Sequence, residues 1–129
     1  MTTRVTVDAH AGWPVRVTAL EGTGQTIYSV EPNATRDFYV HSSMDLRIHE
    51  VQPDEKPTFG QKAVGLSFNP SGDQTVNRLK ALYAEIIDIC AEGRAKAGTP
   101  SEAGRLYSVA ITEAQGAQMW AVKASTWRE

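Results

Sequence analysis

The sequence has few of the residues that mark disulfide-bonded, zinc-binding or membrane proteins. Cys90 is the only cysteine among 129 residues, so no disulfide can form within the chain, and we expect this thiol in the core. No apolar run approaches the roughly 20 residues that cross a bilayer, and the first residues lack the apolar core of a signal peptide. We therefore expect no membrane partner and a location in a reducing cytosol.

The chain also lacks a large excess of charge of either sign. The chain has 13 Lys and Arg residues against 15 Asp and Glu residues, which gives a formal net charge of −2. A general nucleic-acid binder normally has a strongly basic face, so we expect no DNA or RNA polymer as partner. A local basic pocket stays open as an alternative, because net charge does not report how charges are distributed.

The residue constellations of enzymes and metal sites are absent as well. The Gly-Thr-Gly turn at 22–24 lacks the third glycine of a phosphate-binding loop, and no His-Glu-x-x-His motif occurs. His41 and His49 can meet across a hairpin, but two imidazoles without a third ligand make a poor metal site. Residues 108–113 (Ser-Val-Ala-Ile-Thr-Glu) have no histidine nearby in sequence to activate their hydroxyls. We therefore expect no enzyme, no cofactor and no metal.

The first 57 residues are predicted to be a β-rich region. Turn residues separate segments in which apolar and polar side chains alternate, a pattern that predicts an antiparallel meander with one solvated face. The predicted strands are 4–8, 15–20, 26–30, 38–41 and 46–51. Residues 58–70 are predicted to be a connector that carries ligand contacts.

Residues 71–129 are predicted to form an antiparallel helical hairpin. Ser71 or Asp73 can cap the first helix, and Thr99, Pro100 and Glu102 predict the start of the second. The first helix has an apolar stripe at helical spacing, formed by Val76, Leu79, Leu82, Tyr83, Ile86, Ile87 and Cys90. The fold class is therefore α+β, with an N-terminal antiparallel sheet before a C-terminal hairpin.

The second predicted helix is apolar on more than one side. A chain of this size offers it only one small core, so we expect another face to contact a second copy of the chain. The hairpin would then mediate oligomerisation, and Trp120 and Trp127 would lose solvent on assembly rather than on folding alone.

The segment before the first long helix can bind a small ligand. Phe68 offers a flat face for stacking a base, and Asn69 adds an amide at a helix N-terminus, where free N–H groups attract anions. The side-chain amide of Asn77 can hydrogen-bond to a polar edge of the ligand, and the planar guanidinium of Arg94 is suited to binding phosphate. The alternative is structural: Phe68 staples the helix to the sheet, Asn77 is solvated, and Arg94 stabilises a helix C-terminus.

Two stretches resemble a family of phage counter-defence proteins. They are Val-Gly-Leu-Ser-Phe-Asn-Pro-Ser-Gly (64–72) and Ala-Ile-Thr-Glu-Ala-Gln-Gly-Ala-Gln-Met-Trp-Ala-Val-Lys-Ala (110–124). Both are similar to the helical hairpin shared by the Thoeris anti-defence proteins of the first type and the anti-CBASS cyclic-oligonucleotide sponges. The resemblance covers about residues 60–127. A β-rich region before the hairpin is typical of the Thoeris branch.

The resemblance implies a non-catalytic sponge in the cytoplasm of the infected bacterial host. Such proteins sequester cyclic nucleotide immune signals, here glycocyclic ADP-ribose from TIR-domain enzymes, and some also bind cyclic di- or trinucleotides at separate sites. It implies pockets between protomers of a hexamer built as a trimer of dimers. Phe68, Asn77 and Arg94 match its ligand contacts in order and approximate spacing, while Arg47 and Arg105 are candidates for a second site. The alternative function is a structural or regulatory homo-oligomer whose hairpin only mediates assembly.

Overall fold

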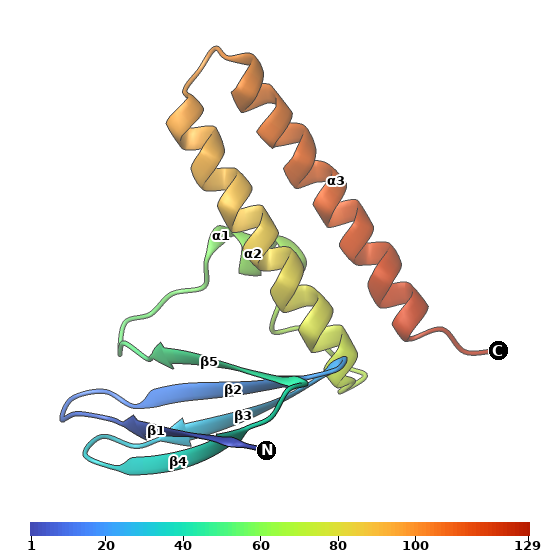
Figure 1. Cartoon of the computed structure of the whole chain (residues 1–129). Coiled ribbons are helices and arrows are strands. Elements are labelled where there is room, and N and C mark those ends of the chain that lie inside the picture. Colours follow the sequence, from blue (N-terminus) through green and yellow to red (C-terminus); the bar gives the residue numbers. More distant parts are fainter. The chain divides into compact units, whose positions relative to one another are not determined.

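The computed structural model describes all 129 residues and divides into two compact units, Met1–Lys56 and Pro57–Glu129. The first unit contains strands and no helix, and the second contains helices and no strand (Figure 1). Each unit has a buried apolar cluster of its own. The predicted α+β class, with antiparallel sheets before a helical pair, is confirmed.

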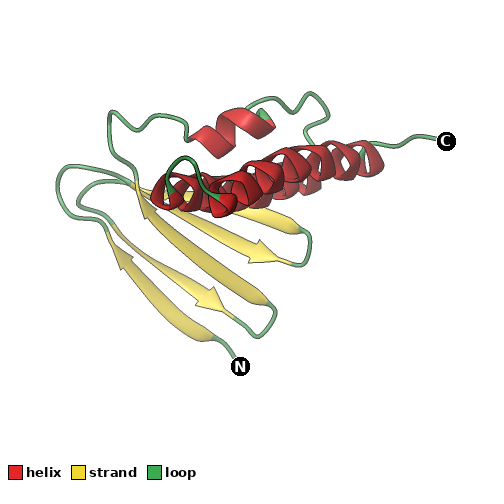
Figure 2. Ribbon diagram, turned by 90° about the horizontal axis from the view of Figure 1, so that it is seen from above, coloured by secondary structure: helices red, strands yellow, loops and turns green.

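All strand pairings in the first unit are antiparallel. The strands are β1 (Thr3–Asp8), β2 (Val15–Glu21), β3 (Gly24–Val30), β4 (Thr35–Val40) and β5 (Met44–Glu50). One sheet pairs β1 with β4, and the other has the order β3-β2-β5 (strands yellow in Figure 2). The strand positions are predicted to within a few residues, but the predicted meander is wrong, because β4 pairs with neither β3 nor β5.

The departure from a meander has a local cause after β3. Asn33 has a left-handed backbone with φ of 65°, which turns the chain away from the sheet. Its N–H then donates to the carbonyl of Ala9 at 2.8 Å, and the N–H of Ala9 donates to the carbonyl of Ala34 at 3.0 Å. These bonds hold the start of β4 beside the end of β1, so β4 pairs there. Both sheets supply the core of this unit, formed by Val7, Ala9, Val17, Val30 and Phe38.

Two long helices dominate the second unit. Helices α2 (Gln74–Ala97) and α3 (Glu102–Ser125) have 24 residues each, about 36 Å at the helical rise, and lie antiparallel side by side (Figure 1). Asp73, one of the two predicted caps, begins α2 by accepting from the N–H of Thr75. The predicted start of α3 at Thr99 is wrong. Ser101 caps α3 instead, because its hydroxyl accepts from the N–H of Gly104 at 2.9 Å, which leaves Thr99 in the turn.

A short helix, α1 (Phe59–Val64), is an additional element inside the predicted connector. A capping box starts it: the Thr58 hydroxyl accepts from the N–H of Gln61 at 3.2 Å, and the Gln61 side chain accepts from the N–H of Thr58 at 3.0 Å. The carboxylate of Asp88 on α2 then accepts from the Thr58 hydroxyl and from the N–H of Gly60, each at 2.7 Å. These bonds fix α1 against α2.

The core of the helical unit is small for three helices. Ile87 is fully buried on α2, and Cys90 is only partly buried against the core, so its predicted place inside the core is wrong. The buried cluster consists of Val64, Ala84, Ile87 and Ile111. Many large apolar side chains stay exposed on the two long helices, namely Leu82, Ile86, Ile89, Leu106, Tyr107, Val109, Met119 and Trp120. None of the helices has the length and apolar content needed to cross a membrane.

Candidate ligand-binding site

The loop between α1 and α2 carries the first group of predicted ligand contacts. Gly65 ends α1 with a left-handed φ of 60°, a backbone that glycine adopts without strain. A turn follows in which the N–H of Phe68 donates to the carbonyl of Gly65 at 2.9 Å. A second turn brings the N–H of Gly72 to the carbonyl of Asn69 at 3.2 Å. Hydrogen bonds therefore order the loop between its two flanking helices.

Side-chain amides join this loop to the first turn of α2. The NH₂ group of Asn69 donates to the side-chain oxygen of Asn77 at 2.8 Å and to the carbonyl of Asp73 at 2.9 Å. The hydroxyl of Ser71 donates in turn to the side-chain oxygen of Asn69 at 2.6 Å. Because the Asn77 oxygen accepts from Asn69, the group that Asn77 can offer to a ligand is its NH₂ donor.

The ring of Phe68 points to solvent beside this network. Phe68 is 72% exposed, so it is not part of the core of the helical unit. The Lys80 ammonium lies 5.7 Å from the ring centroid. The structure thus brings Phe68, Asn69 and Asn77 to one end of the helical unit, with an apolar face and polar groups together, as small-molecule sites require.

The N-terminus of α2 is a weaker anion site than the sequence predicts. The Asp73 carboxylate already accepts from the N–H of Thr75 at 2.7 Å, so the protein supplies its own negative charge there. A phosphate group at this position would be repelled by the carboxylate. The positive group that neutralises a bound phosphate must therefore come from another part of the structure.

Arg94 does not join the other predicted contacts within one chain. It lies in the last turn of α2, with its guanidinium 5.8 Å from the ring centroid of Phe59. Asn77 and Arg94 are 17 positions apart on this helix, which corresponds to about 26 Å along its axis. One small ligand cannot touch both residues of the same copy. A shared site therefore requires the Arg94 of a second copy.

The two arginines suggested for a second site lie in different units. Arg47 is exposed on β5, and Arg105 is exposed near the start of α3. Arg105 is held by Glu102, whose two oxygens accept from its Nη2 at 2.5 Å and its Nε at 3.0 Å. This hydrogen-bonded pair raises the pKa of Arg105 and lowers the pKa of Glu102. Glu102 occupies the Nε and Nη2 edge of the guanidinium, so an anion would have to bind the Nη1 side or displace this carboxylate.

Histidines and acidic residues form no metal centre. His41 contacts Glu21 at 3.3 Å and His49 contacts Glu55 at 2.6 Å, so each imidazole has a separate carboxylate partner. No group of three His, Cys, Asp or Glu side chains lies close enough to hold a metal ion.

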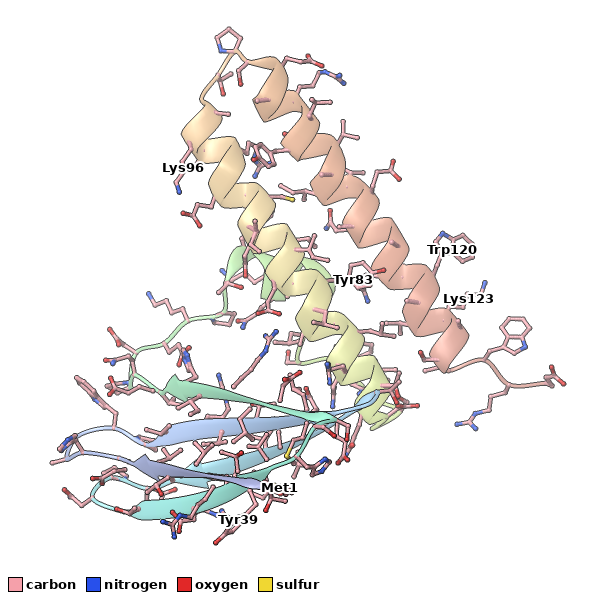
Figure 3. All side chains as sticks on the ribbon, in the orientation of Figure 1. Met1, Tyr39, Tyr83, Lys96, Trp120 and Lys123 are labelled. Carbon is pink, nitrogen blue, oxygen red and sulfur yellow. The ribbon has the colours of Figure 1, made fainter.

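Two surface hollows lie outside the predicted site. Trp120 and Lys123 project from α3 on the side away from α2 (Figure 3), and with Ala124 and Trp127 they line an open hollow of about 520 Å³. The two tryptophans are 70% and 65% exposed in the single chain. A smaller hollow of about 250 Å³ lies in the first unit and includes Arg36, whose guanidinium stacks 4.7 Å from the ring centroid of Tyr28.

One residue of the site was not predicted as a contact. Lys80 is 6% exposed and donates from Nζ to the carbonyl oxygens of Gly65 and Phe68. A sequence signal for it exists, since Lys80 lies four residues from both Val76 and Ala84, which are buried on the same face of α2. A lysine inside a buried helical stripe needs polar partners.

Comparison with known families identifies the helical unit. The sequence pattern of the family described as "Acb2/Tad1, hairpin domain" matches residues 61–126, just over half of the chain. No curated protein and no solved structure matched the chain. The matched residues include α2, α3 and the loop that carries Phe68. The chain therefore belongs to the Acb2/Tad1 hairpin family, whose members are sponge-type phage anti-defence proteins that bind cyclic nucleotides.

Proposed function

We propose that this chain is a phage-encoded sponge that sequesters glycocyclic ADP-ribose and thereby blocks a TIR-dependent defence in the cytoplasm of the infected bacterium. The observation that carries the proposal is the ordered loop 65–72 in a chain of this family: it exposes the ring of Phe68, and the next residue, Asn69, hydrogen-bonds to the side chain of Asn77. A purine can stack on the ring while the amide donates to a polar edge. Cyclic di- and trinucleotides are candidates for separate sites.

The proposed pocket is completed by a second protomer. Arg94 lies about 26 Å along α2 from Asn77, so its guanidinium serves a ligand at this loop only when it comes from another copy. The exposed apolar side chains of α2 and α3 and the tryptophan hollow are surfaces suited to such assembly. We propose a hexamer built as a trimer of dimers, in which Trp120 and Trp127 lose solvent.

The function is tested by capture and release. The protein is incubated with glycocyclic ADP-ribose, separated from free ligand, heat-denatured, and the supernatant is analysed by chromatography and mass spectrometry. Intact ligand in stoichiometric amount supports sequestration. Degraded ligand would indicate an enzyme. No retained ligand would leave the structural or regulatory homo-oligomer, which the exposed apolar faces of the hairpin also support.

Arg94→Ala is expected to weaken binding of glycocyclic ADP-ribose by about 10- to 150-fold, the effect of losing a hydrogen bond from a charged group, about 1.5–3 kcal/mol. Isothermal titration calorimetry measures the affinity, and sedimentation velocity reports the assembly. The matched control is Lys96→Ala in the same turn, which removes the same charge from a side chain already paired with Glu92 at 2.8 Å. Equal affinity for the wild type and Arg94→Ala would remove Arg94 from the site.

A further inference from the structure

The most unusual charged group of the helical unit is the ammonium of Lys80. Its side chain is 6% exposed, between Val76 and Ala84 on the buried face of α2. Its ammonium donates to the backbone carbonyl of Gly65 at 3.1 Å and to the backbone carbonyl of Phe68. A buried ammonium is costly unless its donors are satisfied, so these carbonyls are necessary partners.

The two acceptors are the two ends of one turn. The N–H of Phe68 donates to the carbonyl of Gly65, and Lys80 bonds the carbonyls at both positions from inside the unit. The turn is thereby attached to α2 at Lys80, seven residues after Asp73, whose backbone carbonyl accepts from the side chain of Asn69, the residue that follows Phe68. The backbone that carries the Phe68 ring is fixed from both sides.

The same ammonium also defines which face of the ring is open. It lies over the Phe68 ring, 5.7 Å from the centroid, so one ring face is directed at Lys80. The other face is left for stacking, and the 72% exposure of the side chain is consistent with an open face. A ring held in its binding orientation loses less conformational freedom when a ligand binds.

We infer that Lys80 is the positioning residue of the ligand site: it fixes the 65–68 turn and presents the outer face of Phe68 for stacking. This inference rests on the proposed function for the identity of the ligand, but not for the ordering of the turn. Lys80 itself need not touch the ligand. Its contribution is the pre-organisation of a side chain that does.

Lys80→Met separates positioning from folding, because methionine keeps most of the apolar stem and removes every donor. The Gly65 carbonyl keeps its bond from the N–H of Phe68, so the Phe68 carbonyl is the one acceptor that loses its partner. The variant is therefore expected to fold. Hydrogen exchange followed by NMR or mass spectrometry on the full chain reports the Phe68 amide and the α2 amides separately.

The expected result is at least about tenfold faster exchange of the Phe68 amide in Lys80→Met, with α2 amides unchanged, and about tenfold weaker binding of glycocyclic ADP-ribose. Lys80→Arg, which keeps a charged donor, should recover part of both effects. Lys62→Met, which removes an exposed lysine from the last turn of α1, should change neither.

Three outcomes would overturn the inference. Unchanged exchange of the Phe68 amide in Lys80→Met would show that the turn does not depend on Lys80. Faster exchange with unchanged affinity would show that the ordering has no part in binding. Faster exchange throughout α2 would assign Lys80 to general stability. If the wild type binds no glycocyclic ADP-ribose while the Phe68 amide alone becomes faster, the proposed function fails and the positioning of the turn stands.

Discussion

Gly60→Ala is expected to lower the free energy of unfolding of the helical unit by about 3 kcal/mol, the upper range for an overpacked site. A Cβ at this position would lie 2.1 Å from the backbone carbonyl oxygen of Ala84 and 2.9 Å from the Asp88 carboxyl carbon. The backbone of α2 cannot move aside as a flexible side chain can, so α1 must shift. That shift would also weaken the bonds from Gly60 and Thr58 to Asp88.

Urea unfolding followed by circular dichroism at 222 nm measures this change. The matched control is Gly116→Ala in α3, where an added Cβ meets nothing within 4 Å. Alanine there should stabilise the helix by about 0.5–1 kcal/mol through its higher helix propensity. Opposite signs for the same substitution would support the close contact of α1 with α2. A Gly60→Ala variant as stable as the wild type would contradict it.

Phe68→Ala is expected to weaken binding of glycocyclic ADP-ribose by about 5- to 150-fold, because stacking of one base on an aromatic ring contributes about 1–3 kcal/mol. The stability of the protein should stay close to that of the wild type, since the ring is largely exposed and outside the core. This combination of lost affinity and kept stability distinguishes a binding residue from a packing residue.

Calorimetry at matched protein concentration measures the affinity, and thermal unfolding measures the stability. Tyr39→Ala serves as the control, because it removes an exposed aromatic ring from β4 in the other unit. An affinity loss shared by both variants would point to a nonspecific effect of surface aromatics. A Phe68→Ala variant that binds as the wild type does would place the base elsewhere.

Local patterns predicted the elements, while their pairing depended on contacts distant in sequence. Alternation located the five strands, and Asp73 was among the predicted caps of α2. The pairing of β4 with β1 could not be predicted, because it depends on the left-handed turn at Asn33 and its bonds to Ala9. Helix α1 has a readable capping box at Thr58 and Gln61, but six residues are too few for a clear apolar period.

The candidate site was predictable in its residue types and only partly in its geometry. An aromatic ring, an amide and a helix start are visible in the sequence around Phe68 and Asn77. Arg94 lies far from Asn77 in the same chain because one continuous helix separates the two residues. The burial of Lys80 required the fold, because only the path of the 65–68 turn brings two carbonyls to its ammonium.

The division of the chain into two units between residues 56 and 57 has a consequence for how such proteins can evolve. Each unit has its own buried cluster, and the match to the hairpin family, residues 61–126, falls entirely within the second unit. A recombination event near Pro57 could therefore join the hairpin to a different N-terminal module and break neither core. A phage lineage could keep the helices and exchange what precedes them.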